Sequence, residues 1–327
     1  MGTTQYDKSI VGPLRNASLY RVGIDENGLG ARLGPLVVTA VVAAVSKEGD
    51  TRLDHWNSNE HRHVLDDSKQ LIRHGDVRLG EAWARVLANQ PTRDPAELLQ
   101  LISAVPIDKL MARCPKNAQL QCWNSQSDGF LASEGLVAQV GDELQTLREM
   151  GIYPCRVLSR LVCTDELNAR GQTGENRFLV DLHCMEELVV QIANFVNQPL
   201  LAVCGKVGGM YKYPRGFSEL VKNIPVTICE TAELSAYKLT SIGEVRFMKD
   251  ADSIDPLVML ASLVGKYLRE LFVSRIGHHF SGLISDIHKP SGYHDSVTKK
   301  FIVATESYRK QSVFPLLCFE RTTRRDR

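Results

Sequence analysis

Two adjacent carboxylates, Asp25 and Glu26, follow a short β-rich run at residues 20–24 and precede a turn that contains Gly28 and Gly30. Glycine allows positive φ angles and a close approach of the backbone to a ligand, and hard divalent cations prefer carboxylate oxygens. A strand, an acidic pair and a glycine turn in this order therefore predict a metal held beside a polyanion. A β-hairpin with a polar turn is an equally good interpretation of this stretch alone, because Asp, Glu, Asn and Gly are ordinary turn residues.

The hydrophobic pattern around this stretch alternates between strands and helices. Strands are expected at 20–24, 36–45, 156–164, 199–204, 226–229 and 244–248. Helices are expected at 77–87, where Asp76 is the predicted cap, at 178–196, and from Pro256 onward. The polar residues that begin at Ser46 are expected to form a loop. The pattern predicts an α/β protein.

The chain divides into three expected parts. Residues 1–19 are polar and aperiodic and are expected to form a flexible arm. Residues 20–320 form the main domain, in which 88–150 is interpreted as an inserted helical region packed on the core. Residues 321–327 hold four arginines and are expected to be a solvated basic tail, or a weak anchor for nucleic acid.

Composition limits the possible functions only weakly. The chain has 327 residues, 43% of them apolar and 24% charged, with a net charge of +1, so a nucleic-acid surface must be local. Eight cysteines are scattered without a C-x-x-C pair, which favours free thiols in a reducing compartment. The amino terminus lacks a signal-peptide core, and no apolar run reaches the ~20 residues of a membrane span. We therefore expect a cytoplasmic protein with no membrane contact.

Short motifs follow one another along the chain. They are DENGLG at 25–30 with LGP at 33–35, DSKQL at 67–71, KDAD at 249–252, ASLVGK at 261–266 with RE at 269–270, and SGY at 291–293 followed by Asp295 and Thr298. In this order they resemble the motifs of the ribonuclease HII family, the type 2 ribonucleases H, of which this chain would be a divergent member. The resemblance implies a ribonuclease H-like core with a mixed central sheet flanked by helices.

The resemblance also implies a metal-dependent endonuclease that cleaves the RNA strand of RNA/DNA hybrids. In-line phosphodiester hydrolysis by such enzymes uses Mg²⁺ or Mn²⁺ held by carboxylates. Asp25, Glu26 and Asp252 match the catalytic and metal-binding positions, and Glu270 matches an acidic residue that supports them. The alternatives are that Asp252 is a solvated turn residue or helix cap, and that Glu270 forms a surface pair with Lys266.

Substrate contacts are predicted partly from the motifs and partly from the turn at 205–215, which carries three basic and two aromatic side chains. Such a turn can bind phosphates and stack on bases, or it can be an ordinary hairpin tip. The predicted substrate-binding residues are Gly28, Gly30, Lys69, Lys206, Lys212 and Tyr293. For Lys69 the alternative is a solvated lysine, and for Tyr293 it is a core or interface tyrosine.

Two positions depart from the family pattern. Related enzymes carry an aspartate at the end of the central strand, where this chain has Cys204, and a neutral thiol is a poor ligand for Mg²⁺. Asp181 offers another alignment for the missing carboxylate, although the residues after it favour a helix whose first turn it would occupy. Asp250 is a nearby carboxylate that can compensate. Leu29 replaces the family's arginine, which puts specificity for a single ribonucleotide in doubt.

Three hypotheses follow. The first is an endonuclease whose partner is an RNA/DNA hybrid or DNA with embedded ribonucleotides. The second is a catalytically weakened or inactive relative that binds nucleic acid or a protein partner without cutting, as Cys204 and Leu29 suggest. The third is an unrelated α/β enzyme whose glycine turn imitates the motif.

Overall fold

The computed structural model describes residues 19–56, 65, 76–115, 121–311 and 316–322. Their central element is a seven-stranded sheet with the strand order β3-β2-β1-β4-β7-β6-β5. The strands are β1 (Leu19–Asn27), β2 (Leu36–Val45), β3 (Ile152–Val162), β4 (Leu200–Gly205), β5 (Val226–Glu230), β6 (Leu234–Leu239) and β7 (Gly243–Met248). The sequence predicted six of these strands and missed β6.

The sheet is mixed. β2 is antiparallel to both of its neighbours, β1 and β3, whereas β4 is parallel to β1 and β7 is parallel to β4. Three antiparallel strands followed by two parallel ones form the expected ribonuclease H-like core, and β6 and β5 extend it by antiparallel pairing. The predicted α/β fold with a mixed central sheet is thus confirmed.

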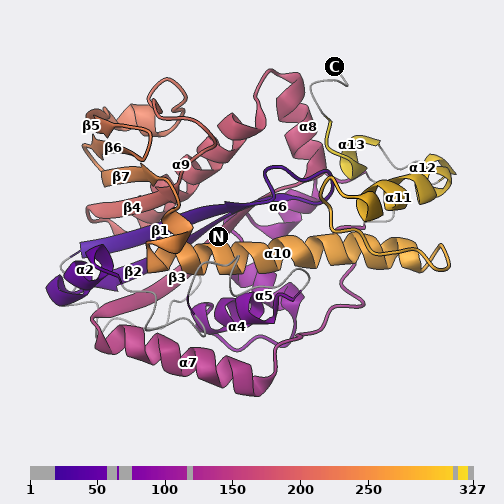
Figure 1. Cartoon of the computed structure of the whole chain (residues 1–327), viewed down its shortest axis with the longest axis horizontal. Helices are drawn as coiled ribbons and strands as arrows, with labels where there is room; N and C mark the ends of the chain where they lie inside the picture. Colours follow the sequence, from indigo (N-terminus) through magenta and orange to yellow (C-terminus); the bar gives the residue numbers. More distant parts are fainter. Residues whose placement is uncertain (1–18, 57–64, 66–75, 116–120, 312–315, 323–327) are drawn as a thin grey trace.

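Helices cover both faces of the sheet (Figure 1). The helices are α2 (Lys47–Asp54), α4 (Arg78–Leu87), α5 (Pro95–Ile102), α6 (Ile107–Met111), α7 (Glu134–Glu149), α8 (Thr164–Gln172), α9 (Arg177–Val196), α10 (Pro256–Ser281), α11 (Ser296–Ala304), α12 (Glu306–Gln311) and α13 (Leu316–Phe319). One core lies between the sheet and α10, with α4, α5 and α7 packed outside it. A second core lies between the opposite face and α9. No described helix is long and apolar enough to cross a membrane.

The region 88–150 contains the two expected helical pieces, α5 and α7, together with the short helix α6. Val140, Leu144 and Leu147 of α7 are buried in the same core as α10. The buried carboxylate of Glu81 also accepts hydrogen bonds from backbone N–H groups at 131 and 132, at 2.8–3.0 Å. The region is therefore part of the main core.

Two local expectations were wrong. The polar stretch after Ser46 contains helix α2, because the Ser46 hydroxyl accepts a hydrogen bond from the Gly49 N–H at 3.0 Å and caps the helix. Helix α4 begins at Arg78 with Val77 at the cap position, so Asp76 is not the cap. It accepts a hydrogen bond from the Arg78 N–H at 3.2 Å instead.

Gly23 in β1 lies directly against the first turn of α10. A Cβ atom at this position would lie 2.1 Å from the carbonyl carbon of Leu257 and 2.3 Å from the nitrogen of Val258. Because these atoms belong to the backbone, the helix would have to move. We expect Gly23→Ala to lower the free energy of unfolding by ~1–3 kcal/mol or more, measured by denaturant titration.

Gly141 provides the matched control. It lies in the middle of α7, where a Cβ atom would meet nothing within 4 Å. Gly141→Ala should therefore stabilise the protein by up to ~1 kcal/mol, because alanine has the higher helix propensity. An unchanged stability in Gly23→Ala would contradict the tight packing of β1 on α10.

Candidate active site

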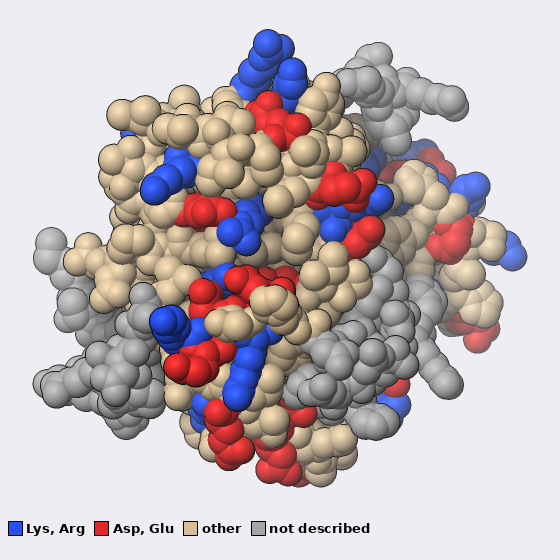
Figure 2. Space-filling view, turned by 60° about the vertical axis from the view of Figure 1, so that its left-hand side comes forward, with Lys and Arg blue, Asp and Glu red and all other residues tan. Residues whose placement is uncertain are grey.

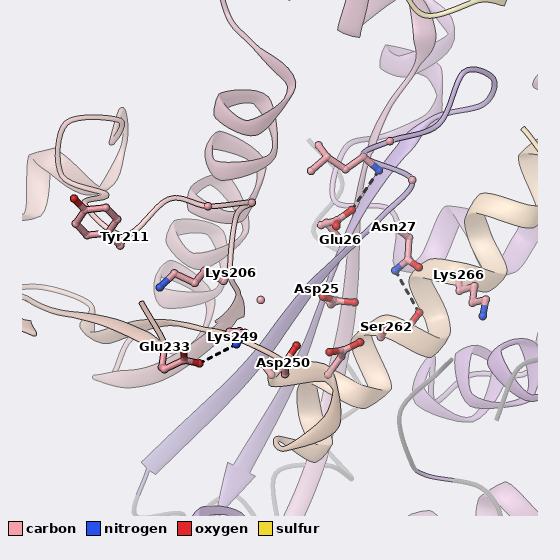
Figure 3. A pocket seen from close by; sticks show the side chains of 18 of the residues that line it. Asp25, Glu26, Asn27, Lys206, Tyr211, Glu233, Lys249, Asp250, Ser262 and Lys266 are labelled. Carbon is pink, nitrogen blue, oxygen red and sulfur yellow. Dashed lines mark hydrogen bonds and ion pairs between the residues drawn. The ribbon is translucent and has the colours of Figure 1, made fainter. Parts of the chain in front are cut away.

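An open cleft of about 830 Å³ lies at the carboxyl ends of the parallel strands β1, β4 and β7 (Figure 3). Parallel strands bring their carboxyl ends to one edge of a sheet, which is where ligands bind in open α/β folds. Asp25 and Glu26 reach the cleft from the end of β1. Asp252 reaches it from a short 3₁₀ helix (Ala251–Ser253) between β7 and α10. The three carboxylates predicted as catalytic therefore line one cavity.

Asp25 lies among these carboxylates. Loss of hydration raises its pKa well above the ordinary value, and the neighbouring charges of Glu26 and Asp252 raise it further, whereas a hydrogen bond with Ser262 of α10 lowers it. Like charges this close favour the neutral carboxyl or a bound cation. The electrostatic interaction between Asp25 and Asp252 shows that β1 and the segment before α10 bring their acidic side chains together.

Glu26 and Asp250 are two further acidic residues that line the cleft. Glu26 accepts a hydrogen bond from the Leu29 N–H at 3.3 Å. Asp250, which adopts a left-handed backbone at φ = 52°, also lines the cleft. Among the described residues, no three histidine, cysteine or acidic side chains are grouped so that they could hold a metal ion as they lie.

Asp181 differs from the sequence expectation. Helix α9 begins at Arg177, so Asp181 lies beyond its first turn and does not serve the helix dipole. Its side chain is completely buried, and neither carboxylate oxygen has a hydrogen-bond partner. Burial raises its pKa well above the ordinary value, and the charges of Glu26 and Asp25 raise it further. Asp181 therefore lies in the protein interior, close to Asp25 and Glu26 but outside the lining of the cleft.

Cys204 does not face the cleft. It lies opposite Ile24 in the parallel pair of β1 and β4, and both side chains are buried in the core against α9. The next residue, Gly205, lines the cleft, and a Cβ atom there would lie 2.9 Å from Oδ1 of Asp25. In this strand register, a carboxylate at position 205 rather than 204 would point at Asp25.

The predicted basic contacts are only partly present. Lys69 lies outside the described residues. Lys206 lines the cleft, but its ammonium donates hydrogen bonds to the carbonyls of Thr231 and Ala232, at 2.8 and 2.6 Å. Lys212 does not line the cleft, and its ammonium lies 5.7 Å from the centre of the Tyr211 ring.

The two aromatic residues of the turn 205–215 have different environments. Tyr211 is half-exposed and lines the cleft opposite Asp25 (Figure 3). Tyr213 is completely buried and stacks on Phe247, with ring centres 3.8 Å apart. Of these two aromatic residues, Tyr211 is therefore available for stacking, whereas Tyr213 belongs to the core. On the face shown in Figure 2, basic and acidic side chains lie among one another, and neither sign forms a continuous area.

Tyr293 lines the cleft and is 40% exposed. The guanidinium of the buried Arg269 lies 4.0 Å from the centre of its ring and also donates a hydrogen bond to the carbonyl of Ser291 at 2.8 Å. Glu270 lines the same cleft and forms an ion pair with Arg269. Arg269 thus fixes the tyrosine and an acidic side chain of the cleft together.

Two arginines that the sequence analysis missed hold the glycine turn. Arg321 is completely buried and donates hydrogen bonds to the carbonyls of Gly28 at 2.5 Å and Gly34 at 2.8 and 3.0 Å. Arg177 donates to the carbonyl of Ala31 at 3.3 Å. The expectation that Arg321 belongs to a solvated tail was wrong, because the carbonyls of this turn require donors from elsewhere in the chain. No local pattern could have paired Arg321 with carbonyls 287 and 293 positions away.

No protein-family model and no curated protein matches this chain. Among solved structures it is similar to ribonuclease HII of Archaeoglobus fulgidus, from a complex with PCNA, at 18% identity over 94% of this chain and 100% of that one, with a TM-score of 0.41. Similarity also extends to ribonuclease H2 of Pyrococcus horikoshii OT3, at 16% identity over 94% and 95% of the chains, with a TM-score of 0.42. Bst-RNase HIII in complex with Mn²⁺ is 11% identical over 98% of this chain and 71% of that one, with a TM-score of 0.44. The strand order and the cleft define a ribonuclease H-like α/β protein with an acidic site.

We expect Asp181→Asn to raise the melting temperature of the metal-free protein at neutral pH. Because the folded-state pKa of Asp181 lies above the unfolded value of about 3.9, its stabilising contribution is complete below that value and is lost as the pH rises through the folded pKa. The asparagine side chain cannot ionise, so the variant does not lose this stability. A rise in melting temperature of roughly 2–4 °C would correspond to about 1 kcal/mol in the free energy of unfolding of a large domain.

The difference between Asp181→Asn and the wild type should disappear in acid, as followed by thermal melts over a pH series. Asp142→Asn on the exposed side of α7 is the control and should show no such pH dependence. A lower melting temperature for Asp181→Asn at neutral pH would contradict the account of an unpartnered buried carboxylate.

Proposed function

We propose that this protein is a divalent-metal-dependent endonuclease that cleaves the RNA strand of RNA/DNA hybrids. The observation that carries the proposal is the meeting of Asp25 and Asp252 in one cleft, where the charge of Asp252 helps to raise the pKa of Asp25. A solvated turn residue, the alternative for Asp252, has no reason to lie beside a second carboxylate. Hydrolysis of a phosphodiester needs such a concentration of acidic groups when divalent cations neutralise the reacting phosphate.

The chemistry of the donors fits Mg²⁺ or Mn²⁺. Asp25, Glu26 and Asp252 offer carboxylate oxygens, which these cations prefer. Burial raises the pKa of Asp25, and the charges of Glu26 and Asp252, which a cation would neutralise, raise it further. These three residues would hold the metal. When bound, divalent cations lower the pKa of a water molecule and stabilise the charge on the leaving oxygen. Ser262 orients Asp25 through its hydrogen bond.

Asp181 is the best candidate for the remaining carboxylate of the site. Its unpartnered oxygens lie close enough to Glu26 and Asp25 for the three charges to interact, and no carboxylate projects from the end of β4. In this proposal Asp181 supports Glu26 from behind, and Glu270 has the same supporting role from α10. Asp250 is a further carboxylate at the rim of the cleft.

The substrate would lie across the glycine turn and Tyr293. Gly28 and Gly30 line the cleft, so their backbone can approach a ribose closely and contact its 2′-hydroxyl. The Tyr293 ring, held from behind by Arg269, presents its other face to a sugar. Lys249, which forms an ion pair with Glu233 at 3.4 Å, and Lys266 also line the cleft and would add positive charge beside the phosphates.

A weakened or inactive relative that binds nucleic acid without cutting is the second candidate. Two observations favour it: the end of β4 contributes Gly205 instead of a carboxylate to the cleft, and Lys206 is engaged by backbone carbonyls. Fewer ligands weaken metal binding, and an occupied lysine contributes less to phosphate binding. The active endonuclease and the inactive relative would bind nucleic acid in the same cleft and would differ in the rate of cleavage.

Cleavage of a labelled RNA/DNA hybrid in Mg²⁺ and in Mn²⁺ tests the proposal. We expect Asp25→Asn and Asp252→Asn each to lower the rate by ~10²–10³-fold, because each removes a ligand that is worth several kcal/mol in the transition state. Asp142→Asn, which changes the same chemical group on the exposed face of α7, should cleave at the wild-type rate.

Two outcomes would contradict the endonuclease. Salt-sensitive binding of the hybrid without cleavage in either metal would favour the second candidate. Failure to bind any hybrid would favour an unrelated α/β enzyme. Cleavage that survives in Asp252→Asn would remove the segment before α10 from the site.

Tyr293 tests recognition of the ribose. We expect Tyr293→Ala to slow cleavage at a ribonucleotide embedded in DNA by roughly 10–100-fold, because a sugar or base packed on an aromatic ring contributes ~1–3 kcal/mol. Tyr293→Phe keeps the ring and should lose much less. Equal losses in both variants would assign the effect to the hydroxyl group, and no loss in either would place the substrate elsewhere.

A further inference from the structure

The wall of the cleft opposite α10 is built by the loop after β4, the β5–β6 turn and the end of β7. Tyr211, Lys206 and Lys249 line this wall, and Figure 3 shows Tyr211 and Lys206 on the other side of Asp25 from Ser262. Tyr211 is 49% exposed, so about half of its side chain is free to contact a ligand. The roles proposed for the acidic side chains and the glycine turn leave this ring unused.

The loop that carries Tyr211 is anchored by other residues. Tyr213 is buried, its hydroxyl accepts a hydrogen bond from the Val207 N–H at 3.0 Å, and its own N–H donates to the Tyr237 hydroxyl at 3.2 Å. The buried Ser235 hydroxyl of β6 donates to the carbonyl of Tyr211 at 2.8 Å. A tyrosine that only anchored the loop would be buried as Tyr213 is. These contacts instead fix the backbone around Tyr211 and hold its half-exposed ring at the wall.

The β5–β6 turn places two lysines on the same wall. The Lys206 ammonium donates to the carbonyls of Thr231 and Ala232 at 2.8 and 2.6 Å. An ammonium has three N–H donors, so within the described structure these two hydrogen bonds leave the third N–H for a ligand. Lys249 forms an ion pair with Glu233 at 3.4 Å, and its backbone N–H donates to the carbonyl of Glu233 at 2.9 Å. One turn therefore positions both ammonium groups.

An aromatic ring and ammonium groups on one wall are the combination with which proteins bind single-stranded nucleic acid. The ring stacks on a base, and the ammonium groups contact phosphates. Inside a duplex both faces of a base are covered by its neighbours, so an internal base pair cannot stack on Tyr211. An unpaired base next to the end of a duplex has a face free. The exposed ring therefore fits an unpaired nucleotide better than a paired one.

We propose that this wall binds an unpaired nucleotide, so that the protein prefers RNA/DNA hybrids with a single-stranded extension over blunt hybrids. Tyr211 stacks on the unpaired base, and Lys206 and Lys249 contact the neighbouring phosphates. The inference rests on the proposed endonuclease, because the paired part of the hybrid occupies the acidic side of the same cleft. It adds the kind of duplex end that is recognised and makes Tyr211 a determinant of specificity rather than a catalytic residue.

Two hybrids that differ only at one end test the preference. One is blunt, and the other carries a short run of unpaired deoxynucleotides at its 5′ or its 3′ end; EDTA prevents metal-dependent cleavage. We expect the wild type to bind the hybrid with one of these extensions roughly 5–100-fold more tightly than the blunt hybrid, the effect of one stacked base, as measured by fluorescence anisotropy. Tyr211→Ala should lose this difference while binding the blunt hybrid as the wild type does. Tyr211→Phe keeps the ring and should keep the difference.

A fluorescent base in the extension reports the stacking itself. The fluorescence of 2-aminopurine should fall when the extended hybrid binds the wild type and should stay unchanged with Tyr211→Ala. A merely structural role of the tyrosine would not produce this signal. Tyr308→Ala removes an exposed tyrosine on α12 and is the matched control, which should behave as the wild type in both measurements.

Failure of this inference is distinguishable from failure of the endonuclease. If the wild type binds and cleaves the blunt hybrid but binds all the hybrids equally, the wall does not bind an unpaired nucleotide, and the endonuclease stands. A preference that survives in Tyr211→Ala would likewise overturn the role of the ring. Failure of the wild type to bind any of the hybrids would overturn both proposals.

Discussion

The first turn of α10 rests directly on β1, and this contact positions most of the acidic cleft. No side chain can stand at Gly23, because the backbone at Leu257 and Val258 occupies that space. The close approach sets Ser262 at hydrogen-bond distance from Asp25 and brings the segment that carries Asp252 to the end of the strand. It is reinforced where the Asn27 amide donates to the carbonyl of Ser262, 235 positions away, at 3.3 Å.

The cleft is also where this protein concentrates its unfavourable electrostatics. Burial raises the pKa values of Asp25 and Asp181, the charges of neighbouring carboxylates raise them further, and neither carboxylate oxygen of Asp181 has a hydrogen-bond partner. Burying charge without compensation is costly, and sequences selected for stability alone replace such groups. The arginines at 269 and 321 are buried nearby, but they hold the tyrosine and the glycine turn, and neither forms an ion pair with the carboxylates of β1 or α9 within the described structure.

Sequence reasoning succeeded where a property is local. The run 36–45, which is apolar except for Thr39, is strand β2 residue for residue, and Pro256 opens α10 as expected. The family resemblance, rather than a local pattern, predicted that Asp25 and Asp252 belong to one site, and both line the same cleft. Sequence reasoning failed where the outcome depends on register or distant contacts. Neighbouring residues of a strand point to opposite faces, so a motif alone could not decide whether position 204 or 205 faces the cleft.

The same limit explains the other misses. In the sequence, Arg321 looks like part of a basic tail. Its structural role could not be predicted, because its partners are carbonyls of a turn near the other end of the sequence. Tyr213 and Tyr211 are two residues apart, yet one belongs to the core and the other to the cleft.

The hold of Arg321 on the glycine turn has a consequence for biosynthesis. Domains fold while the chain emerges from the ribosome, amino terminus first. Strand β1 is available early, but the turn that follows it gains the hydrogen bonds of Arg321 only when residue 321 has left the exit tunnel. A nascent polypeptide from which residue 321 has not yet emerged would lack these hydrogen bonds, so the glycine turn gains them only after the segments between residues 34 and 321 have been synthesised.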